Sequence, residues 1–504
     1  MQLRKFVWVL VVGLASVVFW QAAHSAQTQD DDAELYRLFV DALEHVDRNY
    51  VKKVDRRQLV ESAIVGMLNE LDPYSNFIAK EEFKQFDRTT KGKFGGIGVQ
   101  ISMKDGVLTV MSPLVGTPAY EAGIIAGDRI LEVNGQNLRG WTLNDIVDKL
   151  TGPAGSEVTL KVQHPPYDQP PVEITLKRAN INVESVLGDT HGPSDEWDFM
   201  LDKENKIGYI RINSFIQDTK DNLQAAIDKL LKEGMKGLIL DLRYNPGGLL
   251  SSAIEVSDLF VGEGTIVSTK GRTSTDKTYE ARKEGTLPDF PMVVLVNGFS
   301  ASASEIVAAC LQDHERATVI GERTWGKGSV QNVIELEGGE SALKLTTAAY
   351  RRPNGHNIHR FEDSKEEDEW GVSPNKGFDV KFSKKDHNVY QRWRFQKDQI
   401  VGKRKSENGT ATAAPVEPKE EPKADGKEGA KPDEKPVSDE KKDEPKKDEK
   451  SVKPNSEGND SESGDELSIE DATDEEVKNF KDPQLAKALD FLKSELTKTA
   501  KKDG

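Results

Sequence analysis

The chain has very little cysteine and no excess of basic residues. Cys310 is the single cysteine in 504 residues, so no disulfide can form within the chain. No Cys/His cluster has the spacing of a zinc site, and no P-loop or dinucleotide-binding fingerprint occurs. The formal net charge of −17 argues against a nucleic-acid partner, which would require a basic surface to neutralise phosphates. We therefore expect no metal and no cofactor.

Long apolar runs are also scarce, and the longest one lies at the amino terminus. Arg4 and Lys5 precede an apolar run from Phe6 to Trp20, which the small-residue stretch 22–26 follows. This order is typical of a secretory signal, and the run is shorter than the roughly 20 residues of a membrane span. We expect residues 1–26 to be a signal peptide, with an uncleaved anchor as the alternative. The protein is then exported, and either periplasmic or membrane-associated.

Three segments with different patterns follow the amino-terminal run. Residues 30–88 repeat apolar side chains at helical spacing and predict an N-terminal helical segment. Residues 89–180 combine short strand patterns with many glycines and two short helices, which predicts a small capped barrel. Residues 185–400 alternate strands and helices, which predicts a layered α/β core. Gly237–Leu242 is continuously apolar, as expected for a strand that is covered on both faces.

The carboxyl-terminal part changes character at about residue 403. Residues 411–450 hold 10 lysines, 13 acidic residues and 6 prolines, without any aromatic residue, leucine or isoleucine. Such a segment cannot bury enough apolar surface to offset its ordering entropy, so residues 403–466 are expected to be a disordered charged linker. Apolar residues then recur at helical spacing, and 467–504 is expected to be a C-terminal helix that packs on the body or on a second subunit.

Two apolar strands of the expected core end in unusual loops, at the sheet edge where α/β proteins bind ligands. The first loop contains Gly247 and Gly248, and the second contains Ser302 at the start of a helix. A serine there could act as a nucleophile, with the N–H of Ala303 and a glycine N–H facing a developing oxyanion. The alternative is structural, because Ser302-x-x-Glu305 also fits a helix capping box.

A nucleophilic serine needs a base. The downstream histidines, His314, His356 and His359, do not lie in a recognisable triad motif. Lys327 lies between two glycines and next to Trp325, and burial of a lysine can bring its pKa towards neutrality. An ordinary surface lysine in a glycine turn is the alternative interpretation.

The stretch from Asn297 to Gln331 resembles the C-terminal processing peptidases, tail-specific serine proteases that are related to tricorn. The shared pattern is Ser-Ala-Ser-Ala-Ser-Glu, then a strand, Gly-Glu, Gly-Lys-Gly and Val-Gln. The resemblance implies a crotonase/ClpP-like α/β protease core with an inserted PDZ domain at 89–180. It also implies roles for residues of this chain: Ser302 as nucleophile, Lys327 as general base, Gln331 as the residue that orients the lysine, and the N–H groups of Ala303 and Gly248 (or Gly247) as the oxyanion hole.

The same resemblance suggests how substrates are selected. Phe94-Gly95-Gly96-Ile97-Gly98 matches the PDZ loop that offers N–H groups to a peptide carboxylate, beside which the peptide adds as a strand. Arg178 stands where related enzymes carry a gating arginine, although it could be a plain surface residue. The expected partners are unfolded or exported proteins held by their C-termini, with a possible adaptor protein and a possible homodimer. Trp370 to Asn375 departs from the family pattern, which puts the local loop in doubt.

Two other functions compete with an endopeptidase. An inactive relative could use its PDZ domain only to bind exported proteins. A crotonase-like acyl enzyme on a related core would need a basic patch for coenzyme A, and the PDZ-like segment and the export signal speak against it.

Overall fold

The computed structural model describes residues 33–502, except for 81, 84–85, 87–89, 91, 274–275, 403, 406–410 and 413–471. The expected signal peptide and most of the expected linker lie outside the described residues. Within the linker range, β22 (Arg404–Lys405) pairs with β23 (Ala411–Thr412), so these few residues form short strands where none was expected.

The N-terminal segment begins with two helices but does not stay helical. Residues 33–49 form the first helix, and α2 (Arg56–Asn69) is capped by the Asp55 side chain, which accepts hydrogen bonds from two backbone N–H groups. We expected helices over 30–88, but β1 (Asn76–Ile78) is a strand that pairs antiparallel with β21 (Ser341–Arg351). This pairing attaches the N-terminal segment to the core.

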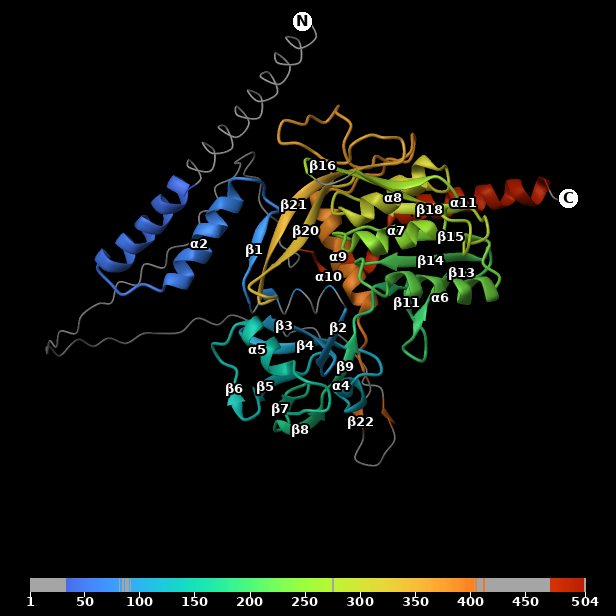
Figure 1. Ribbon diagram of the computed structural model, residues 1–504. Helices are drawn as coiled ribbons and strands as arrows, with labels where there is room; N and C mark the ends of the chain where they lie inside the picture. Colours follow the sequence, from blue (N-terminus) through green and yellow to red (C-terminus); the bar gives the residue numbers. More distant parts are fainter. Residues whose placement is uncertain are drawn as a thin grey trace, which may run out of the picture.

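The PDZ-like part is a six-stranded antiparallel sheet with two short helices, α4 (Pro118–Glu121) and α5 (Leu143–Leu150). Its strands are β3 (Val99–Lys104), β4 (Val107–Pro113), β5 (Arg129–Val133), β6 (Gln136–Asn137), β7 (Glu157–Gln163) and β8 (Val172–Lys177). A two-stranded ribbon of β2 (Lys93–Gly96) and β9 (Ala179–Asn182) joins this part to the core, as Figure 1 shows.

The core contains two sheets. The central sheet has four parallel strands, flanked by antiparallel β10 (Val186–Leu187) and β13 (Met200–Asp202). The parallel strands are β14 (Ile207–Ile212), β15 (Gly237–Asp241), β18 (Met292–Val296) and β19 (Thr318–Gly321). The second sheet combines β1 and β21 with β16 (Thr265–Gly271), β17 (Lys277–Glu280) and β20 (Ser329–Leu336). A short hairpin joins β11 (Thr190–His191) to β12 (Trp197–Asp198).

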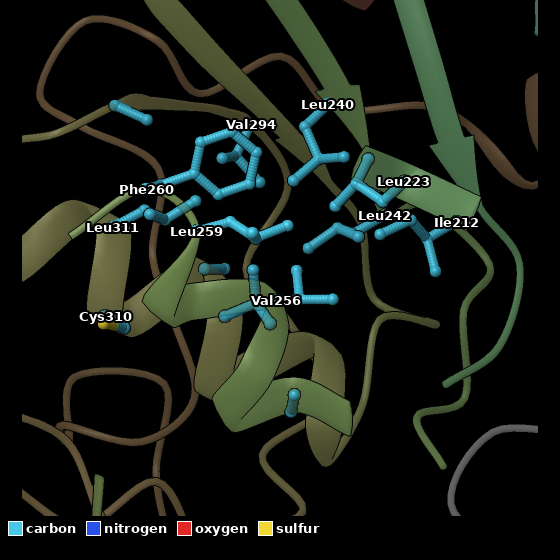
Figure 2. Packing of buried hydrophobic residues seen from close by; sticks show 14 of the residues in the cluster. Ile212, Leu223, Leu240, Leu242, Val256, Leu259, Phe260, Val294, Cys310 and Leu311 are labelled. Atoms are coloured by element: carbon cyan, nitrogen blue, oxygen red, sulfur yellow. The ribbon is translucent and has the colours of Figure 1, made fainter. Parts of the chain in front are cut away.

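Both faces of the central sheet are covered, which explains its continuous apolar strands. On one face, Leu238 and Leu240 pack with side chains from α6 (Thr219–Lys232), α7 (Leu250–Asp258) and α8 (Ala303–Asp313), part of which Figure 2 shows. Burial raises the pKa of the Cys310 thiol in this cluster to about 12, so Cys310 is a buried helix residue and not a nucleophile.

The opposite face of the central sheet is covered by the C-terminal helix α11 (Pro483–Lys502). Ile239, Val293 and Leu295 pack there against Ala488 and Leu492. Two further helices, α9 (Lys384–Asp398) and α10 (Asp474–Asn479), pack together beside this layer. The C-terminal segment is therefore part of the body of the protein.

Candidate active site

Three serines lie close together before and at the start of α8, and the structure separates their roles. The hydroxyl of Ser300 donates to the carbonyl of Leu242 at 2.8 Å, and that of Ser304 donates to the carbonyl of Asn245 at 2.9 Å. Both side chains thus hold the loop after β15. Ser302 is the N-cap residue of α8, is 9% exposed, and has a φ of 57°, a strained value for a residue other than glycine. Ser302 is therefore the one of these three serines whose hydroxyl is not bound to a carbonyl of the loop after β15.

The loop after β15 approaches Ser302 closely. A Cβ on Gly247 would lie 2.8 Å from the Cβ of Ser302 and 3.0 Å from the N of Ala303, so only glycine fits there. The N–H of Gly247 donates to the Asn245 side chain at 2.9 Å. The N–H groups of Gly248 and Ala303 have no acceptor among the described residues. The pair available to bind an oxyanion is therefore Ala303 with Gly248, and Gly247 supplies the close approach instead.

Glu305 connects the backbone at Ser302 to the loop that carries Gly326 and Lys327, here called the lysine loop. Its carboxylate is fully buried and accepts hydrogen bonds from the N–H groups of Ser302 (2.8 Å), Lys327 (2.8 Å) and Gly326 (2.7 Å), and from the Thr324 hydroxyl (2.6 Å). Burial raises the pKa of Glu305 to about 7, against the effect of these donors. The capping-box pattern anticipated the bond to Ser302, but not the bonds to the second loop.

Replacing Glu305 by glutamine is expected to loosen both loops. An amide nitrogen would face donors where the carboxylate now accepts, and each unsatisfied buried group costs about 1–3 kcal/mol. A displacement of about 1 Å at the reacting atoms can lower the rate by about 10²-fold. Urea unfolding and kcat measurements check this, with Glu335→Gln on an exposed part of β20 as the matched control. Equal values for the two variants would contradict the role of Glu305.

Lys327 is half-buried, and its ammonium lies 4.8 Å from the centre of the Tyr74 ring. Burial and the charge of Lys344 lower the pKa of Lys327, while Glu305 and Asp72 act in the opposite direction. The Lys327 ammonium makes no hydrogen bond with any described residue, and the Ser302 side chain interacts with Tyr350 instead. The backbones of Ser302 and Lys327 are thus held by the same carboxylate, and no hydrogen bond joins their side chains among the described residues.

Among the described residues, the hydrogen bonds of the Gln331 side chain do not include one to Lys327. The Gln331 amide donates to the Ser329 hydroxyl at 2.8 Å and to the Thr346 hydroxyl at 3.2 Å. The Thr346 hydroxyl in turn donates to Asp72 at 3.2 Å. The residue expected to orient the lysine is therefore linked to the N-terminal segment.

The three histidines considered as bases do not contact Ser302 within the described part of the chain. His314 is hydrogen-bonded to the carbonyl of Thr265 at 2.8 Å, and His356 is paired with Glu369. The ring centres of His359 and Tyr74 lie 6.4 Å apart, so His359 lies beside the aromatic ring that contacts Lys327. Burial lowers the pKa of His359.

The expected carboxylate-binding loop is only partly a loop. Phe94, Gly95 and Gly96 belong to β2 and pair with β9, which corrects the expectation of an open loop over 94–98. Ile97 is buried in the PDZ-like core, and Gly98, with a φ of 78°, immediately precedes β3. β3 is the edge strand of its sheet, paired with β4 alone among the described strands, and it leaves one side for an added strand.

Arg178 is buried rather than on the surface. It is 8% exposed and donates to the carbonyls of Lys149, Leu150 and Glu157 and to the Ser156 hydroxyl. A cation at the C-terminal end of α5 is favourable because carbonyl groups are free there. The structure brings Arg178 into contact with neither Ser302 nor Lys327.

The sequence did not predict that Asp72 and Tyr74 lie near Lys327. Leu71-Asp72-Pro73-Tyr74-Ser75 falls within the segment 30–88, for which only helices and no site residue were expected. An aspartate followed by proline and serine does indicate a side-chain-stabilised turn. The pattern does not reveal which part of the core the turn contacts.

The fold and the site are those of a serine-type peptidase with an α/β core and a PDZ domain. Peptidase family S41 matches residues 206–374, a PDZ domain matches 109–164, and the activating protease CtpB N-terminal domain matches 16–82. A carboxy-terminal-processing protease of Bartonella bacilliformis is 38% identical over 434 residues, which cover 82% of this chain and 92% of that protein. The chain belongs to the C-terminal processing peptidases of family S41, whose protease core is a ClpP-like α/β fold.

Two further relatives are similar to shorter parts of the chain. The carboxy-terminal processing protease CtpA of Bacillus subtilis is 39% identical over 321 residues, which cover 63% of this chain and 66% of that protein. The solved structure of a photosystem II D1 C-terminal processing protease is 30% identical, covers 68% of this chain and 92% of its own, and has a TM-score of 0.38.

Among the residues that the structure describes, no helix combines the length and the apolar character of a membrane span.

Proposed function

We propose that the protein is an exported endopeptidase that cleaves near protein C-termini through Ser302 and Lys327. The observation that carries this proposal is the buried Glu305 carboxylate, which holds the backbones of both residues in one site. The strained Ser302 at the start of α8, next to two unused N–H groups, supports the role of nucleophile. The lowered pKa of Lys327 supports the role of base.

In the proposed reaction, the Ser302 Oγ attacks the scissile carbonyl carbon and its proton passes to the Lys327 Nζ. The N–H groups of Ala303 and Gly248 stabilise the oxyanion. The peptide C–N bond then breaks, the leaving amine takes the proton from Lys327, and an acyl-enzyme remains on Ser302. Water, deprotonated by the same lysine, hydrolyses the ester and restores the hydroxyl. Gln331 would orient Lys327 once substrate binding has moved the Gln331 amide to the lysine.

Substrate selection is proposed to depend on the PDZ domain. A peptide would pair with the free edge of β3, and its terminal carboxylate would lie at the backbone turn of Ile97 and Gly98. Phe94 to Gly96, which pair with β9 in the two-stranded ribbon, would lie beside the bound carboxylate. Arg178 would act on gating only indirectly, by fixing the end of α5.

The PDZ proposal predicts a dependence on the free carboxylate. We expect an unstructured peptide with an apolar C-terminus to be cleaved with a kcat/KM about 10-fold above that of its C-terminal amide, because one or two charge-assisted hydrogen bonds are lost. Steady-state kinetics with both peptides measures this ratio, and Ser302→Ala should bind the acid form without cutting it. Equal cleavage of both peptides would contradict the proposed carboxylate site. Binding without cleavage by wild type would favour a PDZ binding protein or an enzyme that awaits an activator.

Export and self-association complete the proposal. Residues 1–26 would direct the chain out of the cytoplasm, and cell fractionation with and without them tests this. Large apolar side chains are exposed on the N-terminal helices, among them Leu35 (63%), Tyr36 (72%) and Leu38 (67%). We propose that a second copy of the chain covers them. Light scattering of the purified protein and of Leu38→Asp would show a dimer and its loss, whereas a monomer in both cases would point to an adaptor.

A further inference from the structure

The turn at residues 72–75 lies against the lysine loop although it is remote in sequence. The Asp72 carboxylate accepts hydrogen bonds from the N–H groups of Tyr74 and Ser75, both at 2.8 Å, and from the Ser75 hydroxyl at 2.8 Å. The Ser75 hydroxyl accepts from the N–H of Thr346 in β21 at 3.0 Å. Side-chain hydrogen bonds therefore fix both the shape of the turn and its position on the core.

The turn reaches Lys327 and Gln331 by two routes. The ring of Tyr74 supports the Lys327 ammonium, with 4.8 Å between the Nζ and the ring centre. Asp72 accepts from the Thr346 hydroxyl, which itself accepts from the Gln331 amide. Just beyond the turn, β1 pairs with β21 and places Asn76 opposite Lys344.

We propose that Asp72 and Tyr74 are positioning residues for the general base, so that the N-terminal segment completes the surroundings of Lys327 in the protease core. This inference rests on the proposed function of Lys327. The aromatic ring of Tyr74 binds the end of the Lys327 side chain through a cation–π contact and so holds it near Ser302. Asp72 fixes the turn that carries Tyr74 and anchors the Gln331–Thr346 pair. Docking of the N-terminal segment is then a requirement for activity and not only for stability.

Four titratable groups act on the Lys327 ammonium or on its neighbour Asp72. Lys344 on β21 disfavours the ammonium form of Lys327, whereas Glu305 on α8 and Asp72 on the turn favour it. His359, on the loop beside Tyr74, interacts with Asp72. Asparagine in place of Asp72 can keep the Oδ1 acceptor for the two N–H groups and remove the charge.

The experiment measures kcat/KM against pH for wild type, Tyr74→Leu, Tyr74→Phe, Asp72→Asn and Lys344→Gln, each checked for folding by thermal denaturation. We expect Tyr74→Leu to lose about 10²-fold and Tyr74→Phe, which keeps the ring, to stay within about 3-fold of wild type. The activity rises with pH as Lys327 loses its proton. Asp72→Asn should therefore move this rise to lower pH, and Lys344→Gln should move it to higher pH.

The outcomes separate this inference from the proposed function. Full activity of Lys327→Ala would overturn the proposed function itself. If Lys327→Ala is inactive but Tyr74→Leu and Asp72→Asn match wild type in rate and pH profile, the dyad stands and the positioning role is wrong. Lower rates with unchanged pH profiles, accompanied by lower melting temperatures, would reduce the turn to a structural element and also overturn the inference.

Discussion

Replacing Lys327 by alanine is expected to lower kcat by about 10³-fold, because general-base catalysis contributes about 10²–10⁴-fold. The fold should survive, since the backbone N–H of Lys327 that Glu305 binds is kept. Burial lowers the pKa of Lys327, so the rate of the wild-type enzyme should rise with pH through a value below that of an ordinary lysine. The sign follows from the need for a neutral amine, which exists above the pKa.

Lys327→Arg is the matched control for this prediction. It keeps a long cationic side chain, but a guanidinium does not lose its proton in a protein and cannot act as a base. Initial rates on an unstructured protein, between pH 6 and 10, distinguish the cases. Both variants should stay about 10³-fold below wild type at every pH where wild type is active. Activity of Lys327→Arg near that of wild type would show that Lys327 supplies only charge.

Breaking the buried ion pairs of Arg243, in the loop after β15, is expected to have the second large effect. The Arg243 side chain lies between Asp241 and Asp482, at 2.6 Å and 2.8 Å, and all three side chains are almost fully buried. Asp482 also accepts from the backbone N–H of Gln484 at 3.0 Å, at the start of α11. The network therefore joins the C-terminal segment to the loop that carries Gly248.

Asp482→Ala should destabilise the protein by about 3–5 kcal/mol, because it leaves part of a buried charge uncompensated. It should also lower kcat, because Arg243 no longer fixes the position of the Gly248 N–H. Asp490→Ala is the control, since Asp490 is exposed on the same helix and such changes stay within about 0.5 kcal/mol. Denaturant unfolding and kcat measure both effects. An Asp482→Ala protein as stable and active as Asp490→Ala would show that the network does not support the site.

The central part of the fold could be predicted because its physical causes are local. Leu238, Ile239 and Leu240 are all apolar because both faces of β15 are covered, and this pattern is visible without any structure. The second sheet was missed because β20 is mostly exposed and lacks an alternating pattern. β1 was missed because its partner β21 is remote in the sequence.

The position of Ser302 could be predicted from the order of strands and helices along the chain. Ser302 follows a strand and opens a helix, and that is enough to put it at the binding edge of the sheet. The choice of Gly248 over Gly247 depends on a hydrogen bond to Asn245, which no motif encodes. The role of the turn at Asp72 depends on contacts with Thr346, 274 residues away. A contact between residues so far apart in sequence forms only when β1 pairs with β21 in the second sheet.

Covalent trapping of the nucleophile tests most directly whether Ser302 carries the reaction. Wild type, Ser302→Ala and Ser304→Ala would each be treated with a serine-reactive fluorophosphonate and analysed by mass spectrometry, in parallel with cleavage of an unstructured protein. We expect an adduct on Ser302 in wild type and in Ser304→Ala, and neither adduct nor cleavage in a folded Ser302→Ala. Labelling and cleavage that persist in Ser302→Ala would contradict this expectation.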